Sequence, residues 1–86
     1  MDYLHYEFQA GPGQVVEVSL DHQANVLLLD DTNYQNYRRG DAFRYHGGWV
    51  RKSPYRLSPP RFGRWHVVID LGGAGGSIRT AARLVG

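Results

Sequence analysis

Apolar and polar residues alternate with a period of two along most of the chain, and the apolar spacing of an amphipathic helix does not recur. Runs of this kind occur at Leu4–Phe8, Val16–Leu20, Trp65–Asp70 and Ile78–Leu84. Asn25–Leu29 is more continuously apolar, which is typical of a strand covered on both faces. Because β-branched and aromatic residues are frequent in these runs, the pattern predicts β-strands.

The segment between Asp31 and Gly40 breaks the alternation. Asp31 or Thr32 is a residue type that caps the start of a helix, and Gly40 is the type that ends one. The sequence therefore predicts a single helical turn that carries Tyr34 and Tyr37 over one end of the strands.

Two glycine-rich points predict hairpins. Gly47-Gly48 separates Ala42–His46 from Trp49–Arg51, which favours a two-glycine turn between two strands. Gly72–Gly76 separates the last two alternating runs, which predicts a second hairpin with a flexible tip. Pro54–Leu57 predicts a short edge strand, because the proline nitrogen cannot donate a hydrogen bond to a ladder.

Seven or eight short strands at intervals of about ten residues are typical of a β-sandwich or a small barrel. The predicted fold class is therefore all-β, a small antiparallel β-sandwich or barrel with one short helical turn. The chain of 86 residues has the length of one domain, and we expect residues 1–86 to form a single all-β domain.

The amino-acid composition limits the kinds of site that the protein can have and the cellular location in which it acts. The sequence contains no Cys, which excludes disulfide scaffolds, thiol nucleophiles and thiolate metal sites. The longest aliphatic run, Val26–Leu29, is far shorter than the ~20 residues that a membrane helix needs, and the sequence shows no secretory signal pattern. These features favour a cytoplasmic location, with no membrane partner and no cofactor.

Charge is divided unevenly along the chain. All 10 basic residues follow residue 37, whereas six of the 8 acidic residues precede it, and the formal net charge is +2. One interpretation is that early and late strands are neighbours, so that acidic and basic side chains pair across the sheets. The other is a bipolar surface that binds a second copy of the chain or a charged partner.

The middle of the chain interleaves basic residues with aromatic ones. Its aromatic residues are Tyr34, Tyr37, Phe43, Tyr45, Trp49, Tyr55, Phe62 and Trp65. Single-stranded nucleic acids bind such combinations, because bases stack on rings while Arg and Lys contact phosphates. The alternative is that the rings form the core of a small domain, and the low net charge favours this alternative.

The sequence shows no catalytic or metal-binding motif. Leu71–Ser77 lacks the Lys-Ser or Lys-Thr pair and the following helix of a phosphate-binding loop. His5, His22, His46 and His66 have no metal-ligand spacing, and the Ser residues lack the context of a nucleophile elbow. We therefore expect no metal site and no enzyme. An enzyme would need His46 or His66 to meet a carboxylate in a pocket.

An ordered series of motifs extends over nearly the whole chain. The motifs are Gly13-Gln14-Val15-Val16-Glu17-Val18, Ala24-Asn25-Val26, Asp30-Asp31-Thr32-Asn33-Tyr34, Gly47-Gly48, Ser53-Pro54 and Trp65–Gly73. In this series the chain resembles, from Leu4 to Val85, a bacterial family catalogued as domain of unknown function 1883. The resemblance implies a small all-β cytoplasmic protein with no established catalytic residues. Some members of that family are joined to a Toll/interleukin-receptor (TIR) domain, which implies a sensing or adaptor role for those members.

The function predicted from these observations is a non-enzymatic binding or protein-interaction module. Its partner would be an unidentified protein or a second copy of the chain, bound through complementary acidic and basic surfaces. The alternatives are single-stranded nucleic acid, bound through the Arg- and aromatic-rich window 34–65, and a small metal-dependent or hydrolytic enzyme. The candidate binding residues lie in three motif-bearing loops and beside them: Asp30, Asp31, Asn33, Tyr34, Tyr37, Arg38, Arg39, Gly47, Gly48, Trp49, Ser53, His66, Asp70, Gly72 and Gly73.

Overall fold

The computed structural model describes residues 3–70 and 78–85, which form seven β-strands and one α-helix. The elements in chain order are β1 (Tyr3–Ala10), β2 (Val15–Leu20), β3 (Ala24–Asp30), α1 (Asp31–Arg39), β4 (His46–Val50), β5 (Tyr55–Leu57), β6 (Gly63–Asp70) and β7 (Thr80–Val85). All paired strands are antiparallel, which confirms the predicted all-β class with a short helix.

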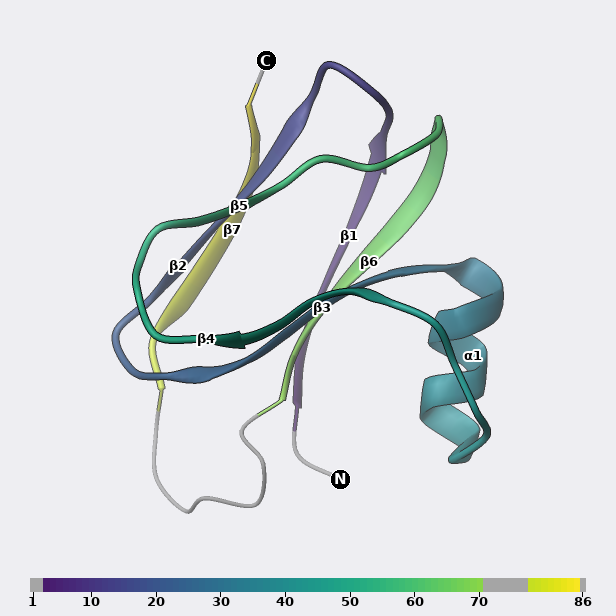
Figure 1. The fold of residues 1–86 in the computed structure, drawn as a ribbon, viewed down its shortest axis with the longest axis horizontal. Coiled ribbons are helices and arrows are strands. Elements are labelled where there is room, and N and C mark those ends of the chain that lie inside the picture. The colour runs from purple at the N-terminus through teal and green to yellow at the C-terminus, as the bar shows by residue number, and fades with distance from the viewer. Residues whose placement is uncertain (1–2, 71–77, 86) are drawn as a thin grey trace.

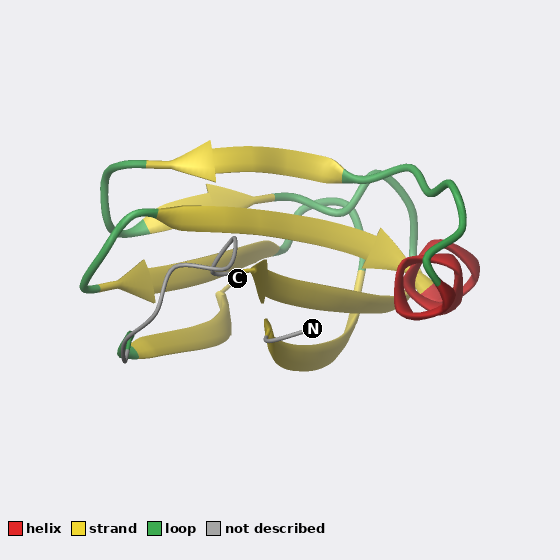
Figure 2. Ribbon diagram, turned by 90° about the horizontal axis from the view of Figure 1, so that it is seen from below, coloured by secondary structure: helices red, strands yellow, loops and turns green. Residues whose placement is uncertain are grey.

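The strands form two sheets. The larger sheet has the order β1-β6-β3-β4, and the smaller has the order β5-β2-β7. In Figure 1, β2, β5 and β7 run together across one side of the molecule, and α1 lies at the opposite side. Figure 2 shows that α1 packs at one end of the strand layers. Pro54 precedes β5, which is an edge strand as predicted.

The main core lies between the two sheets. It is built from the alternate residues of each strand that the period-two pattern places on the inner face. Its buried members are Ala10, Val16, Val18, Ala24, Val26, Leu28, Val50, Trp65, Val67 and Ile69. Because Trp65, Val67 and Ile69 all belong to this core, the face predicted for β6 is confirmed.

A second, smaller core lies on the outer face of the larger sheet, beneath α1. Leu27 and Leu29 of β3 and Val68 of β6 pack there against Tyr34 and Tyr37 of the helix. Strand β3 is therefore apolar on both faces, as its continuous run predicted. These contacts fix α1 against the sheet.

The helix is longer than the single predicted turn and begins one residue earlier. Asp30 is its N-cap, and the Asp30 carboxylate accepts a hydrogen bond from the Asn33 backbone N–H at 2.8 Å. Gly40 ends it in the left-handed conformation, with φ of 79°, as predicted. The cap moves to Asp30 because this residue ends β3 and turns directly into the helix.

Gly47 and Gly48 do not form a hairpin turn, so that prediction is wrong. Both lie within β4 and pair with Leu27 and Val26 of β3. The reason for glycine here is close approach: a Cβ on Gly47 would lie 2.1 Å from the Val26 carbonyl oxygen, and the φ of Gly47 is +119°. Segment Ala42–Tyr45 is consequently not a strand.

The predicted hairpin between the last two strands is also wrong. Strand β6 pairs with β1 and β3, whereas β7 pairs with β2 in the other sheet. Both edges of β6 are already occupied, so β7 has no place beside it. The predicted loop Gly72–Gly76 lies outside the described residues. Helix α1, the helix of the described part of the chain, is neither long nor apolar enough to cross a bilayer.

Candidate functional site

The uneven distribution of charge is largely resolved by pairing within the fold. Glu17 of β2 binds Arg56 of β5 and Arg83 of β7, its direct neighbours in the register. Four further acidic residues of the first half also have partners: Asp21 with His22, Asp30 with Arg61, Asp31 with His66 and Glu7 with Arg64. Most acidic groups in the described residues are therefore already engaged inside the molecule.

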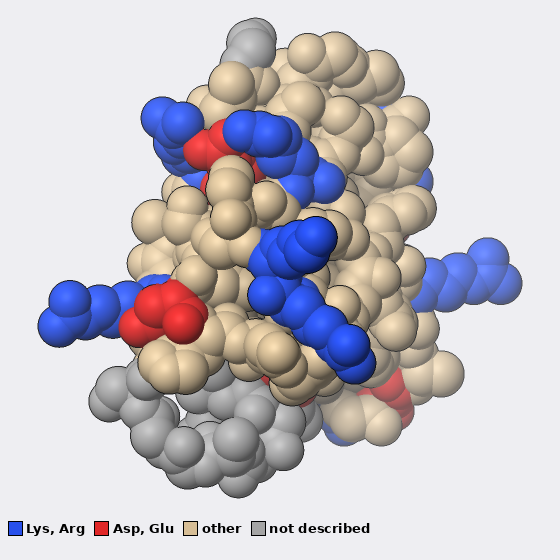
Figure 3. Space-filling model, turned by 60° about the vertical axis from the view of Figure 1, so that its left-hand side comes forward, with Lys and Arg blue, Asp and Glu red and all other residues tan. Residues whose placement is uncertain are grey.

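Several basic side chains have no such partner. Within residues 3–70 and 78–85, Arg38, Arg44, Arg51, Lys52 and Arg79 form no ion pair. In Figure 3 the visible red groups have blue neighbours, whereas two blue side chains near the centre are surrounded by tan surface. The described surface thus has basic charge that is not neutralised locally.

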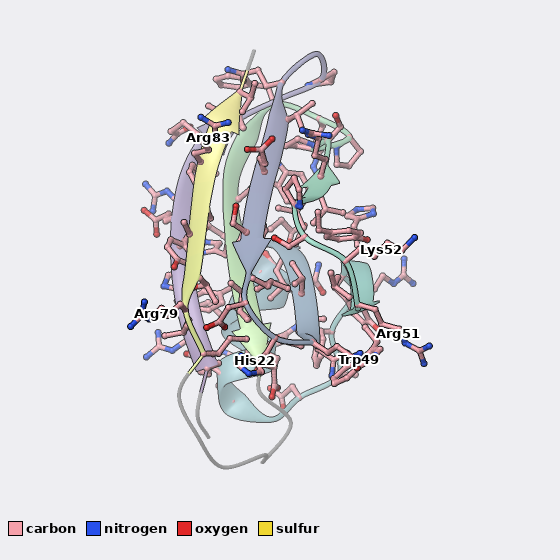
Figure 4. All side chains as sticks on the ribbon, turned by 90° about the vertical axis from the view of Figure 1, so that its left-hand side faces the viewer. His22, Trp49, Arg51, Lys52, Arg79 and Arg83 are labelled. Carbon is pink, nitrogen blue, oxygen red and sulfur yellow. The ribbon has the colours of Figure 1, made fainter. Side chains whose placement is uncertain are left out.

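Two of these unpaired basic side chains follow an exposed tryptophan. Trp49 of edge strand β4 is 51% exposed, and Arg51 and Lys52 follow it closely in the chain. Arg79 precedes β7 of the other sheet and projects on the opposite side of the molecule, where its backbone N–H donates a hydrogen bond to Asp21 (Figure 4). We call the residues Trp49, Arg51 and Lys52, which Figure 4 shows on one side of the molecule, the basic end.

The aromatic window is divided between core and surface. Tyr34, Tyr37 and Trp65 are buried, whereas Tyr45, Trp49 and Phe62 are 48%, 51% and 76% exposed. Phe62 lies against Gly11 near the start of β6, whereas Trp49 pairs with Asn25 at the opposite end of the sheet. The exposed rings therefore do not form one continuous stacking platform.

A cleft of about 660 Å³ opens beside the helix N-terminus. Its lining residues are Leu28, Asp30, Asn33, Phe43, Arg44, Tyr45, His46, Arg61 and Trp65. Arg61 lies 5.0 Å from the centre of the Trp65 ring and 2.5 Å from the Asp30 carboxylate. Burial of Asp30 is outweighed by hydrogen bonds from Asn33 and Arg61, so the pKa of this carboxyl lies below its usual value. The acidic group of the cleft is thus ionised and already bonded.

A histidine cluster lies on the outer face of the larger sheet. His5 Nε2 and His66 Nδ1 are 2.8 Å apart, and the other nitrogen of His66 is hydrogen bonded to the Asp31 carboxylate. Tyr34 stacks on both imidazoles, with ring centres 4.3 Å apart in each case. Glu7 completes the group, with its Oε1 3.7 Å from His66 Nδ1. We call His5, Glu7, His66 and Asp31 the histidine cluster.

The protonation pattern of the cluster follows from its geometry. The Asp31 carboxylate accepts a hydrogen bond from His66 Nε2–H, so Nδ1 of a neutral His66 has a free lone pair and accepts a hydrogen bond from His5 Nε2–H. Burial, with a smaller contribution from neighbouring His66, lowers the pKa of His5. Two nitrogens and a carboxylate oxygen therefore converge on one point, which is an arrangement that can hold a metal ion.

The predicted binding residues separate into distinct places. Asp31, Tyr34 and His66 meet in the histidine cluster, and Asp30 and Asn33 line the cleft. Three other residues of the set lie on α1: Tyr37 donates a hydrogen bond to Asp70, Arg38 lies over the Tyr34 ring, and Arg39 pairs with Asp41. Gly47, Gly48 and the exposed Trp49 lie in β4. The Ser53 hydroxyl accepts a hydrogen bond from the Leu20 backbone N–H. Gly72 and Gly73 lie outside the described residues.

Sequence reasoning missed His5 and Glu7 as partners of His66. The spacing of His5 and Glu7 does place both on one face of a strand. However, His5 and His66 are 61 positions apart, and the pairing of β1 with β6 brings them together. It named His46 only for the enzyme alternative, and it did not predict that Arg44 and Arg61 would line a cleft with it.

Comparison with known proteins gives a family and no closer relative. The family model described as domain of unknown function (DUF1883) matches residues 1–85. No curated protein and no solved structure matches the chain. The family match confirms the resemblance expected from the motifs.

Proposed function

The chain belongs to the DUF1883 family, and we propose that it is a non-enzymatic protein-binding module whose basic end binds an acidic segment of a partner. One observation carries this proposal. Trp49 is 51% exposed on edge strand β4, and it is followed by Arg51 and Lys52, which form no ion pair within the described residues.

The composition of the basic end is that of an energetic centre in protein interfaces. Trp and Arg are the residue types most enriched among interface positions that lose more than about 2 kcal/mol on truncation. Unpaired basic charge around the ring would attract acidic partners and orient them on approach. Because the indole is presented on a strand within a packed sheet, little conformational entropy would be lost on binding.

The charge pairing favours a different protein over a second copy of this chain. The described carboxylates are engaged internally, with Glu17, Asp30 and Asp41 in ion pairs to Arg. A second copy would have to break such pairs before its acidic groups reached the basic end. A partner with free acidic side chains would bind without that cost.

The burial of several rings of the aromatic window favours a protein, rather than a single-stranded nucleic acid, as the binding partner. Nucleic-acid grooves stack successive bases on neighbouring rings. Here Tyr34, Tyr37 and Trp65 pack inside the molecule, and Trp49 is the exposed ring of the basic end. The formal charge of +2 is also small for a phosphate-binding surface.

A binding role is also favoured over catalysis. In the cleft, the Asp30 carboxylate is engaged as a helix cap and as the ion-pair partner of Arg61, and not with His46. His66 does meet a carboxylate, but it is buried and does not line the cleft. We place the protein in the cytoplasm, in keeping with a sequence that has no Cys.

The test is a titration of the full chain with poly-L-glutamate, followed by backbone amide NMR and tryptophan fluorescence. Trp65 is 2% exposed, so a change in emission reports Trp49. The test variant R51Q/K52Q and the control R38Q/R39Q each lose two charges, and the control removes them from the last turn of α1. A (dT)-oligonucleotide of equal charge serves as the competing probe.

We expect amide shifts at residues 49–52 and affinity about 2- to 30-fold lower in R51Q/K52Q, from two exposed charge pairs. The control R38Q/R39Q should stay within about twofold of the wild type. Equal losses in the two variants would show non-specific attraction and contradict the proposal. An oligonucleotide response that exceeds that of poly-L-glutamate and disappears in W49A would assign the surface to nucleic acid instead.

A further inference from the structure

We propose that His5, Glu7 and His66 form a zinc-binding site, in which Asp31 orients His66. The site lies on the outer face of the larger sheet and is independent of the basic end. Its ligand atoms all lie within 4.8 Å of one another. The proposal concerns metal binding and does not rest on the proposed protein partner.

Edge strand β1 and its neighbour β6 place the ligands. His5 and Glu7 are two positions apart on β1, so their side chains leave the same face of the strand. His66 of β6 is the direct register partner of Glu7, and it therefore points to that face too. Two rigid, hydrogen-bonded strands thus supply all three ligands.

Asp31 provides the outer support that a metal-binding imidazole requires. Metal-ligating His residues usually donate their second ring N–H to a carboxylate, which fixes the tautomer and the ring orientation. His66 Nε2 is hydrogen bonded to Asp31 Oδ1, while His66 Nδ1 faces the other two ligands. This contact comes from the first turn of α1, so helix and sheet together position the ring.

The nitrogen atoms need to move only slightly to bind the ion. Tetrahedral zinc with Zn–N bonds of about 2.0–2.1 Å holds its nitrogens about 3.3 Å apart. His5 Nε2 and His66 Nδ1 are now 2.8 Å apart, joined by a hydrogen bond. On binding, the proton leaves His5 Nε2 and a proton is taken up at Nδ1 of the same ring, so the imidazole stays neutral. His5 is exposed and can rotate by this amount.

The charges and the donor types favour zinc. Glu7 and Asp31 together balance the two positive charges of the ion, and two imidazoles with one carboxylate are a known zinc ligand set. Arg64, 3.9 Å from the other Glu7 oxygen, opposes binding weakly because it is half exposed. Tyr34 stacks on both imidazoles, and Arg38 lies 5.8 Å from the centre of that ring. Because His5 and Glu7 are exposed, water would supply the fourth ligand.

The test is titration of the full chain, without a histidine tag, with Zn²⁺ by calorimetry and with Co²⁺ by visible absorption. The ligand variants are H5Q and E7Q, both at exposed positions, and D31N tests the outer support. The matched control is H22Q, which removes an exposed His that is also bonded to an Asp, 2.9 Å away. Long-range ¹H–¹⁵N NMR of the imidazoles identifies the nitrogens that bind.

We expect one equivalent of Zn²⁺, with affinity at least about tenfold lower in H5Q and E7Q and about 10- to 100-fold lower in D31N. H22Q should match the wild type. In the NMR spectrum His66 Nδ1 and His5 Nε2 should shift, while His66 Nε2 stays protonated. Failure of the wild type to bind Zn²⁺, or unchanged affinity in both H5Q and E7Q, would overturn the site.

Discussion

Glu17 on β2 and Arg83 on β7 lie directly opposite each other, with Glu17 Oε1 2.8 Å from Arg83 Nη2. Arg56 on β5 contacts the other carboxylate oxygen at 2.9 Å. Glu17 is central in the smaller sheet, and its 8% exposure shows that the two guanidinium groups cover it. Glu17, from the first half of the sequence, thus pairs with two Arg residues of the second half, and these ion pairs link all three strands of the smaller sheet.

Replacing this carboxylate should make the protein less stable in a pH-dependent way. Hydrogen bonds from Arg83 and then Arg56 lower the pKa of Glu17 below its ordinary value of 4.5. A carboxyl with a lowered folded-state pKa stabilises the fold fully above pH 4.5 and loses this contribution as the pH falls through the folded pKa. We therefore expect E17Q to be destabilised at neutral pH and to approach the wild type in acid, as measured by urea unfolding.

D41N is the matched control for that measurement. Asp41 also pairs with an Arg, but both side chains are more than 60% exposed, at 63% for Arg39 and 61% for Asp41. Such pairs contribute little because water and salt screen them. A difference between wild type and E17Q that stays constant from neutral to acid pH would contradict the role assigned to Glu17.

A side chain at Gly47 should destabilise the larger sheet. Its Cβ would lie 2.1 Å from the Val26 carbonyl oxygen, and its φ of +119° is unfavourable for other residues. We expect G47A to lose about 3 kcal/mol or more of unfolding free energy, through backbone strain and displacement of β3.

The control for Gly47 is Gly63 in β6. A Cβ there meets nothing within 4 Å, and its φ is not positive. G63A should remain within about 0.5 kcal/mol of the wild type in the same denaturant titration. Equal stability of G47A and G63A would show that β4 can move away from β3.

Local patterns could predict the strands, whereas pairings between distant segments could not be predicted. The alternation in Trp65–Asp70 correctly assigned each side chain to one of two faces, because the period of a strand is a local property. Gly47-Gly48 is ambiguous in the sequence, since glycine serves both a tight turn and a close approach between strands. The histidine cluster depends on the register of β1 against β6, which no short motif encodes.

Removing the Tyr37 hydroxyl should weaken the contact between α1 and the sheet. This hydroxyl donates a hydrogen bond of 2.8 Å to the Asp70 carboxylate, and Tyr37 is buried. A hydrogen bond to a charged group contributes about 1.5–3 kcal/mol, and we expect Y37F to lose an amount in this range in chemical denaturation. Y45F, at a half-exposed ring, should change stability by less than about 0.5 kcal/mol.

The same region should make the fold sensitive to alkaline pH. Burial, followed by the hydrogen bond to Tyr3, raises the pKa of Tyr34 from 10.0 to about 12. A phenol with a raised folded-state pKa stabilises the fold fully below pH 10 and loses this contribution as the pH rises through about 12. Unfolding free energy should therefore fall over this interval, and less steeply in Y34F. Equal slopes for wild type and Y34F would contradict the assignment.

Asp30 combines a helix cap with an ion pair, and two variants should separate these roles. Its carboxylate accepts hydrogen bonds from Asn33 N and Nδ2 at 2.8 Å, and it also pairs with Arg61, whose side chain is 61% exposed. D30A loses both roles, whereas D30S keeps a capping hydroxyl and loses the charge. Because the exposed pair is screened by water, we expect D30A to cost about 1–2 kcal/mol and D30S only a few tenths, by thermal and urea unfolding. If D30S were as unstable as D30A, the ion pair with Arg61, and not the cap, would be the stabilising contact at the mouth of the cleft.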